Sequence, residues 1–598
     1  MILTFDFESF AIAPRPEYPP RPVGVAIQID DEAPCYYAWG HPTNNNCLEE
    51  EVIPNLARLL DLCEKFICHN AMFDCSIVEE KWGIPIPWHK AEDTMVMAFI
   101  DNPHGELSLK PLTEELLGLP PEERDAVEVW LINHSVVRAG SKKWGAFIAY
   151  APGDLVGTYA CSDVDRTKKL YDFYLKKWET TPTRVTAYEA ELRLMPHILK
   201  MDQQGVRIDV ATLKKDLNSA YRELDRLDTE ISAILGADVD VDSNEELANA
   251  IEEAGKSKGI ATTATGKRSV AKDSLIGAIA DNQLLGCLLV RNSLATCIRT
   301  FMQPWLEAAE KEPGNRLYIR WNQVRNYSDT GARTGRLSSS PNLQNIPTEW
   351  EKLLSQLETI GYVPTTPMPQ VRKYIIPDDG NILISRDFSG QEMRLLAHFA
   401  GGDLLARLQN EPEADVHMIA ADIAGITRKV AKTLGFAVLY GAGVGRIAET
   451  LNCDVAEASR IKATYLEALP EIKALQADVQ SRGRRNQPIM TLGGRMYYVE
   501  EAKYMEGRVR TFEYKLTNYL IQGSAADQTK AAMEWYCKTT KHSRLLLSVH
   551  DELVIECPVK HQDTEAALLE QAMTNAFGDT LDYHIISTEA RGTNFGVL

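Results

Sequence analysis

The pattern of apolar and polar positions is clearest near the C-terminal end of the chain. Two apolar runs, LLLSV (545–549) and LVIE (553–556), flank His550, Asp551 and Glu552. Short runs of aliphatic and β-branched residues around a polar group predict a strand, a tight turn and a second strand. Asp551 and Glu552 would then stand at the tip of a hairpin. A divalent metal would offset the cost of this acidic pair, although a solvated surface turn explains the same residues.

A second apolar run also ends in a carboxylate. The run 382–384 predicts a strand that ends at Asp387, and Ser389 and Gly390 predict a turn. The apolar residues after the turn recur at helical spacing, which predicts a helix that carries Glu392 near its start. If Asp387 and Asp551 meet, two strand-end carboxylates could hold two Mg²⁺ ions about 3.5–4 Å apart, as in-line phosphoryl transfer requires.

A third stretch repeats chemistry-bearing residues at steps of four. Arg428, Lys432, Phe436 and Tyr440 follow one another at this spacing, so a helix places them on one slowly drifting face. Two cations one turn apart suit a triphosphate, and two aromatic rings beyond them suit a base. The alternative is an amphipathic helix whose basic face is only solvated. The two acidic strand ends elsewhere in the chain favour the first interpretation.

Together these stretches resemble a known family. DFSGQEMR (387–394), R-x3-K-x3-F-x3-YG (428–441) and HDE (550–552) resemble, in this order, the three polymerase motifs of family A DNA polymerases, the bacterial polymerase I type. Two further stretches match the pattern of that family: TGRLSSSPNLQNIP (334–347) and NYLIQGSAAD (518–527). The resemblance implies deoxynucleotidyl transfer to a primer 3′-hydroxyl, with two Mg²⁺ ions, or Mn²⁺ as a substitute, at the active site.

The resemblance also implies roles for single residues. Asp387 and Asp551 would bind the metal, with Glu552 in the catalytic set. Lys432 would hold phosphates and protonate the leaving pyrophosphate. Glu392 would act as a gate against the ribose 2′-hydroxyl. The implied nucleotide-binding residues are Arg428, Lys432, Phe436, Tyr440, Glu392 and His417. The implied DNA-binding residues are Arg336, Asn342, Gln344, Asn518, Gln522 and His550.

The N-terminal part carries a second acidic set. The first strand, ILTFDFES, places Asp6 and Glu8 on one side because strand side chains alternate. Asp74 lies on the first turns of a helix opened by Asn70, and Tyr159 precedes an aspartate by one helical turn. The ordered set resembles a proofreading 3′–5′ exonuclease domain with a ribonuclease H-like fold. The resemblance implies that the catalytic Tyr159 orients the attacking water and that the metal ligands are Asp6, Glu8, Asp74 and Asp163.

The expected fold is α/β and α+β with several domains. We expect a ribonuclease H-like exonuclease domain over residues 1–180, a linker at 181–185, and a right-hand polymerase after it. Its segments would be a helical thumb with adjoining palm at 186–320, the first palm part at 321–400, the fingers at 401–505, and the second palm part at 506–598. The segment 348–370 is longer than the family pattern predicts, and its role stays open.

The net charge of −20 argues against DNA binding only superficially, because basic residues cluster at 265–272, 481–485 and 508–515. The eleven cysteines form no C-x-x-C pair, which is typical of reduced thiols rather than a zinc site. No apolar run approaches the roughly 20 residues that span a bilayer.

These features predict a cytoplasmic protein, in the host cytoplasm if a phage encodes it. The expected partners of this monomer are primer–template DNA and dNTPs, and a replisome or processivity partner is left open. Three alternative functions remain: an enzyme like the single-subunit RNA polymerases, a catalytically silent DNA-binding scaffold, and a pure exonuclease, which would leave the five C-terminal motifs without a function. Glu392 and the exonuclease set disfavour the first alternative, and the intact carboxylates disfavour the second.

Overall fold

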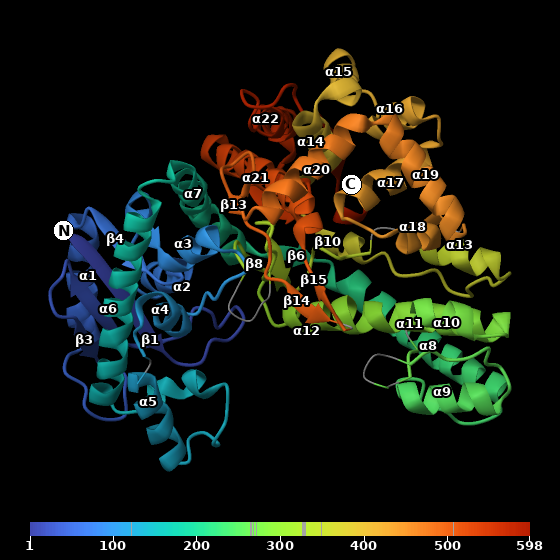
Figure 1. Ribbon diagram of the computed structural model, residues 1–598. Helices are drawn as coiled ribbons and strands as arrows, with labels where there is room; N and C mark the ends of the chain where they lie inside the picture. The colour runs from blue at the N-terminus through green and yellow to red at the C-terminus, as the bar shows by residue number, and fades with distance from the viewer. Residues whose placement is uncertain are drawn as a thin grey trace.

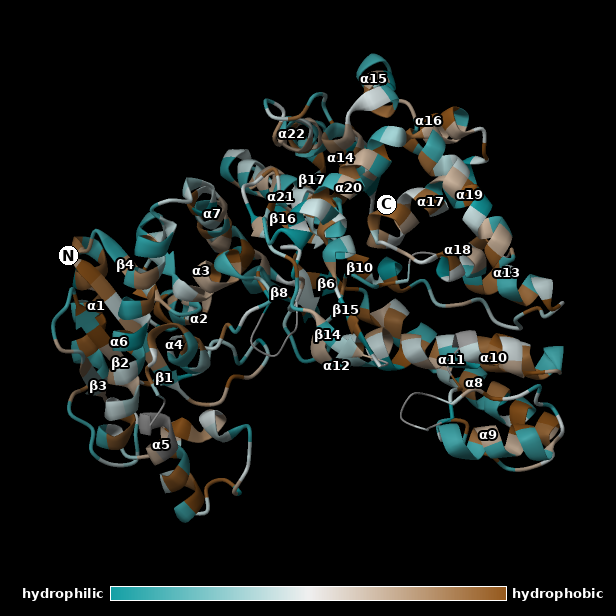
Figure 2. Ribbon diagram, in the orientation of Figure 1, coloured by the Kyte–Doolittle hydropathy of each residue, from teal (hydrophilic) through white to brown (hydrophobic). Residues whose placement is uncertain are grey.

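The computed structural model describes residues 1–598 except 121, 263–265, 267, 271, 326–330, 348–349, 452 and 506. Parts of the basic cluster 265–272 and of the segment 348–370 therefore lie outside the described residues. Figure 1 shows an N-terminal α/β body on one side and a larger C-terminal body on the other, joined by the helix α7. Figure 2 shows hydrophilic residues over α9 and α15, at the outer edges of the molecule.

The N-terminal body is built on a five-stranded sheet in the order β3-β2-β1-β4-β5. β1 pairs antiparallel with β2 and parallel with β4, and α6 packs across β1, β2 and β3. The strands are β1 (Ile2–Ser9), β2 (Pro22–Ile29), β3 (Cys35–Ala38), β4 (Lys65–Cys68) and β5 (Ala91–Asp93). The helices are α1 (Glu49–Leu62), α2 (Ala71–Ser76), α3 (Thr94–Asp101), α4 (Leu109–Leu117), α5 (Glu122–Asn133) and α6 (Gly153–Trp178).

The expected linker at 181–185 is wrong. Thr181 is the residue before the helix α7 (Pro182–Gln204), and Pro182 starts that helix because a first-turn position needs no amide hydrogen. α7 packs against α3 on one side and α21 (Leu516–Thr539) on the other. It therefore connects the two bodies as one continuous helix, and it includes the start of the segment 186–320 that we expected as thumb with adjoining palm.

The helical region after α7 contains α8 (Val210–Leu235), α9 (Asn244–Glu253), α10 (Lys272–Ala278), α11 (Asn282–Cys297) and α12 (Gln303–Ala309). The side chain of Asp209 caps α8 by accepting a hydrogen bond from the Thr212 amide. Among the described residues, one helical stretch, Asn282–Ala309, is long and apolar enough to span a membrane, but 72% of its most apolar window is buried within the protein. Such burial is typical of a helix in the core of a folded protein.

The long segment after residue 349 packs on this helical region. It forms α13 (Glu351–Thr359), which contacts α11. The Tyr362 hydroxyl lies 3.6 Å from the Cys287 sulfur, and Thr366 donates a 3.0 Å hydrogen bond to Glu223 of α8. These contacts hold the segment against the helical region expected as thumb.

The central sheet of the C-terminal body has four antiparallel strands in the order β16-β17-β11-β18. They are β11 (Asn381–Phe388), β16 (Arg544–Val549), β17 (Glu552–Pro558) and β18 (Ser587–Gly592). This sheet joins the two stretches that we expected as separate palm parts. The helix α22 (Gln562–Asn575) packs on the sheet, and α14 (Gln391–Ala400) packs on α21.

Between α14 and α21 the described residues form six helices, in the range 401–505 that we expected as fingers. They are α15 (Gly402–Asn410), α16 (Val416–Ala424), α17 (Arg428–Leu439), α18 (Val444–Leu451), α19 (Val455–Ala468) and α20 (Pro470–Arg484). The other strands are short: β6 (Val206–Ile208), β7 (Arg316–Leu317), β8 (Arg320–Asn322), β9 (Ser338–Ser340), β10 (Ile375–Ile376), β12 (Ile489–Met490), β13 (Met496–Tyr497), β14 (Lys503–Met505) and β15 (Arg508–Arg510).

Candidate active sites

The first acidic site forms where β11 and the β16–β17 hairpin end together. The turn between β16 and β17 contains only His550, with a φ of 58°, and Asp551. Asp387 stands directly opposite Glu552 in the strand register, and the amide of Phe388 donates a 3.3 Å hydrogen bond to the carbonyl oxygen of Asp551. The predicted strand, turn and strand are confirmed, and both strand-end carboxylates meet at one edge.

Electrostatics at this edge favour a bound cation. Burial, followed by repulsion from Asp551 and Glu552, raises the pKa of Asp387 to about 7. Burial also raises the pKa of Asp551 and of Glu552. Arg372, which the sequence analysis missed, approaches Glu552 at 3.4 Å between Nη1 and Oε2. Because the remaining carboxylates face each other, a divalent metal with oxygen ligands fits this donor set.

The predicted helix face exists, and its two cations differ in environment. Arg428 pairs with Asp415, with 2.6 Å between Nη2 and Oδ2. Lys432 is exposed and makes no ion pair within the described part of the chain. Phe436 and Tyr440 stack with 6.1 Å between ring centroids and 15° between ring planes. The face therefore presents one free ammonium group beside a pair of parallel rings.

His417 lies behind this face. Its ring centroid is 5.8 Å from that of Phe436, and its Nδ1 is buried without a hydrogen-bond partner among the described residues. Burial, together with the charges of Lys432 and Arg428, lowers the pKa of His417 to about 4. The ring is therefore neutral at pH 7, and it can offer a hydrogen bond but no positive charge.

Glu392, the predicted gate, is held by residues from three segments. The Tyr440 hydroxyl donates a 3.1 Å hydrogen bond to Oε2, and Nε2 of Gln522 lies 3.4 Å from Oε1. Arg336 forms a short ion pair with Oε1. The Glu392 side chain is buried, so these partners fix its position at the start of α14.

Four of the predicted DNA-binding residues line one cavity of about 460 Å³, namely Arg336, Asn342, Gln344 and His550. Gln344 fixes the adjacent hairpin, because its Nε2 donates to the Ser548 carbonyl at 2.7 Å and its Oε1 accepts from the His550 amide at 2.9 Å. Gln522 instead lies at the gate. Asn518, also on α21, has a buried Oδ1 with no partner in the part of the chain that the structure describes.

The second acidic site lies on β1 and α6 of the N-terminal body. One oxygen each from Asp6, Glu8 and Asp163 lie within 4.8 Å of one another. Burial, followed by the charge of Asp163, raises the pKa of Asp6 to about 7. Asp74 is buried, accepts a 2.9 Å hydrogen bond from the Phe7 amide, and leaves its Oδ2 unpartnered among the described residues. These four carboxylates fit a divalent metal, and three of them already converge.

A cation that the sequence analysis missed completes this site. Nζ of Lys110, on α4, donates to Oδ1 of Asp163 at 2.7 Å and lies 3.4 Å from the centroid of the Tyr159 ring. Lys110 is buried, and it lowers the pKa values of Asp6 and Glu8 against the larger effect of burial. Lys110 belongs to an ordinary amphipathic helix, so no local sequence signal distinguishes it.

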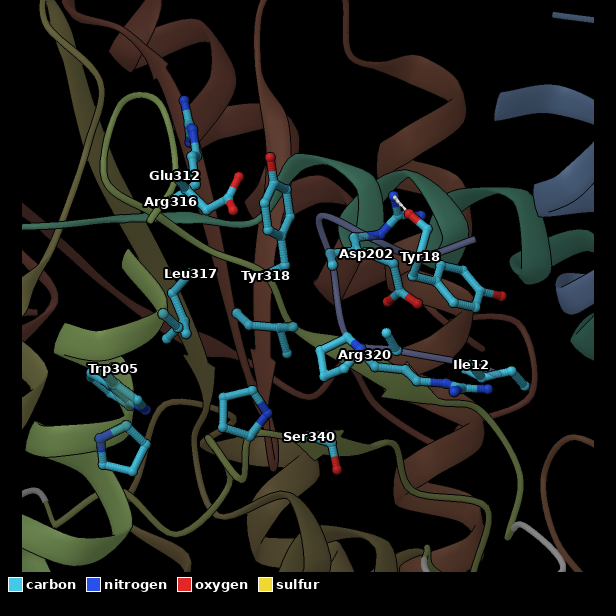
Figure 3. A pocket seen from close by; sticks show the side chains of 17 residues that line it. Ile12, Tyr18, Asp202, Trp305, Glu312, Arg316, Leu317, Tyr318, Arg320 and Ser340 are labelled. Carbon is cyan, nitrogen blue, oxygen red and sulfur yellow. Dashed lines mark hydrogen bonds between the residues drawn. The ribbon is translucent and has the colours of Figure 1, made fainter. Parts of the chain in front are cut away.

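A second cavity, of about 490 Å³, lies away from both acidic sites (Figure 3). It lies between the loop around Ile12 and Tyr18 and Trp305 of the C-terminal body, and Asp202 of α7 lines it. Arg320 reaches across to the loop, with its guanidinium carbon 5.6 Å from the centroid of the Tyr18 ring. None of the carboxylates of the two acidic sites lines this cavity. It therefore marks the junction of the two bodies and not a third acidic site.

Comparisons with known proteins identify a family for each of the two bodies. A family model described as DNA polymerase family A matches residues 210–596, and one described as 3′-5′ exonuclease matches residues 5–179. The thermostable DNA polymerase I of Thermus filiformis is 32% identical over 404 residues, which are 65% of this chain and 46% of that protein. DNA polymerase I of Borreliella burgdorferi is 25% identical over 597 residues, or 97% of this chain and 61% of that protein.

A solved structure described as the POL domain of Pol1 from M. smegmatis in complex with DNA primer-template and dNTP has a TM-score of 0.75 at 20% identity. The match covers 96% of this chain and 93% of that chain, and it confirms the expected fold class. The chain spans about half the length of several curated relatives that it matches. Because the polymerase family model alone covers more than half of the chain, this protein belongs to DNA polymerase family A, with a 3′-5′ exonuclease domain on its N-terminal side.

Proposed function

We propose that the chain extends a DNA primer along a template and removes nucleotides from the primer 3′ end at a separate site. The observation that carries this proposal is the pair of acidic sites. Asp387 and Asp551 meet in the C-terminal body, and Asp6, Glu8 and Asp163 meet in the N-terminal body. Carboxylate clusters of this kind serve phosphoryl transfer when they hold divalent metals.

In nucleotide addition, the primer 3′-hydroxyl oxygen forms a bond to the α-phosphorus, and the bond to the pyrophosphate oxygen breaks. Mg²⁺ held by Asp387 and Asp551, with two ions in the proposed arrangement, would lower the pKa of the hydroxyl and stabilise charge at the α-phosphate. Lys432 supplies a proton to the leaving pyrophosphate, and its ammonium group holds the phosphates with Arg428. Neutral His417 assists Lys432 and Arg428 in holding the phosphates by hydrogen bonding.

The other residues of this site select the substrate. Phe436 and Tyr440 pack against the incoming sugar and base, and Glu392 occupies the space that a ribose 2′-hydroxyl needs. Arg336, Gln344 and His550 line the cavity proposed for primer–template DNA. Because base pairing reads the template, the protein contributes shape selection more than base-edge contacts.

In primer shortening, a water oxygen attacks the terminal phosphodiester and the 3′-oxygen of the preceding nucleotide leaves. Asp6, Glu8, Asp74 and Asp163 would hold the metal ions, which supply an activated water and neutralise the phosphate. Tyr159 orients the water, and Lys110 holds both the Tyr159 ring and Asp163 in place.

The test uses the purified full chain with a labelled primer on a longer template and Mg²⁺. Extension with the four dNTPs, and shortening without them, is the expected result. Extension with rNTPs at a rate equal to that with dNTPs would favour a relative of the single-subunit RNA polymerases. Neither extension nor shortening would favour a silent scaffold and contradict the proposal.

A further inference from the structure

The ribbon formed by β14 and β15 is exposed and carries both aromatic and basic residues. Tyr504 is 76% exposed and Val509 is 65% exposed. Every described residue of the two strands is exposed except Arg510, which is half-buried. Figure 1 shows the ribbon running from the palm helices toward α12, between the N-terminal body and the thumb.

The strand register gives this ribbon two chemically different faces. Tyr504 pairs with Val509, whereas Lys503 pairs with Arg510 and Met505 with Arg508. Because side chains alternate across a strand, Tyr504 and Val509 share one face and the three cations share the other. An aromatic ring on one face and cations on the other suit a nucleic acid strand, whose bases stack and whose phosphates need positive charge.

The base of the ribbon stands between the two acidic sites. Glu500, just before β14, accepts hydrogen bonds from Lys515 at 2.9 Å and from the Tyr519 hydroxyl at 2.8 Å. The Tyr519 ring lies 5.2 Å from that of His104, in the connection that leads to Lys110. Tyr519 also precedes Gln522, which reaches the gate, by one turn of α21.

We propose that this ribbon binds the unpaired 3′ end of the primer strand as the strand passes between the polymerase and exonuclease sites. A base stacks on Tyr504, and Lys503 and Arg508 contact the adjoining phosphates. A strand of three residues covers about 10 Å, a length comparable to one or two nucleotides of an extended single strand. The inference rests on the proposed function, because it requires both sites to act on one primer.

The test measures three reactions of the full chain with unlabelled trap DNA added together with Mg²⁺. They are extension of a matched primer, shortening of a free single-stranded oligonucleotide, and excision of three unpaired nucleotides from a primer–template. Tyr504→Ala and Lys503→Met should slow only the third reaction, by about five- to tenfold, as expected for loss of one base–aromatic stack. Tyr504→Phe, which keeps the ring, should match the wild type.

Unchanged excision in both Tyr504→Ala and Lys503→Met would overturn the ribbon's role. So would an equal loss in all three reactions, because it would place the ribbon on duplex DNA or at the exonuclease site itself. If the wild-type chain fails to extend the matched primer or to shorten the free oligonucleotide, the failure belongs to the proposed function. The melting temperatures of the variants should stay at the wild-type value, since the ribbon is exposed.

Discussion

The hydroxyl of Tyr440 donates a 3.1 Å hydrogen bond to Oε2 of Glu392, and this bond links the end of α17 to the start of α14. Nε2 of Gln522 lies 3.1 Å from the same hydroxyl, so α21 joins the contact. The predicted gate is therefore fixed to the predicted nucleotide-binding helix. A change in the position of α17 would change the space at the gate, because the bond would lengthen or break.

We expect Glu392→Ala to raise ribonucleotide incorporation relative to deoxynucleotide incorporation by about ten- to a hundredfold, because the side chain that fills the 2′-hydroxyl space is removed. The measurement is the ratio of the kcat/KM values for rNTP and dNTP opposite the same template base. Glu392→Gln keeps the shape and should stay near the wild-type ratio. A wild-type ratio in Glu392→Ala would show that another residue excludes the 2′-hydroxyl.

Phe436→Tyr should relax discrimination against dideoxynucleotides. The added ring hydroxyl lies on the face beside Lys432 and can replace a contact that the missing 3′-hydroxyl would make. Chain termination at limiting dideoxynucleotide, compared with extension by the matching dNTP, measures the effect. Phe436→Leu, which adds no hydroxyl, is the control. Termination that stays at the wild-type level in Phe436→Tyr would count against this role for Phe436.

Lys110→Met should slow primer shortening by at least about tenfold and leave primer extension unchanged. Without the ammonium group, Asp163 loses its 2.7 Å partner, the Tyr159 ring loses its neighbour, and repulsion among the carboxylates increases. Lys110→Arg should recover part of the activity. The Mg²⁺ dependence of shortening should also shift in Lys110→Met, which a purely structural lysine would not cause. Unaltered shortening and unaltered Mg²⁺ dependence would refute the positioning role.

Asp202 gives a prediction about pH. Its carboxyl accepts a 2.9 Å hydrogen bond from the Trp321 amide, and burial raises its pKa to about 7. Because the folded pKa lies above the unfolded value, the contribution of this carboxyl to stability is complete at low pH and is lost as pH rises from about 4 through 7. Asp202→Asn removes the cost of the ionised form and keeps an acceptor for Trp321.

Asp202→Asn should therefore raise the melting temperature at pH 8, on the order of 2–4 °C, and have little effect at pH 5. Asp61→Asn, at an exposed position, serves as the control and should leave both values unchanged. An Asp202→Asn variant that is equally stabilised at both pH values would contradict an ionised, buried carboxylate at this position.

Residues whose position follows from strand and helix periodicity were predicted well. Asp6, Glu8 and Asp387 stand at strand positions that follow from the alternation or from the end of an apolar run. Asp551 stands in the predicted turn between two strands. Lys110 and Arg372 were missed, because each reaches its site through tertiary packing and carries no local pattern. The local sequence also gave no sign of the ion pair between Arg428 and Asp415. This pair joins the start of α17 to the start of α16.

The linker expected at 181–185 was not found, for a related reason. The turn-forming composition of 181–185 predicted a linker, but a proline is also compatible with the first turn of a helix, and Pro182 starts the continuous helix α7. Glu191 of α7 is buried between two cations. Its Oε1 lies 2.7 Å from Nζ of Lys530 and also pairs with Arg495, and these partners, distant in sequence, hold α7 against the C-terminal body. A buried carboxylate with two cationic partners can be recognised only once the fold brings the three residues together.

The most direct test of two independent sites is a comparison of Asp387→Ala and Asp6→Ala on the same labelled primer–template with Mg²⁺. Asp387→Ala should lose primer extension by at least about a hundredfold and shorten the primer at the wild-type rate, because its loss affects only the palm carboxylates. Asp6→Ala should extend normally and fail to shorten. If Asp387→Ala still extends the primer, or if either single change removes both activities in a folded protein, the assignment of two separate sites is wrong.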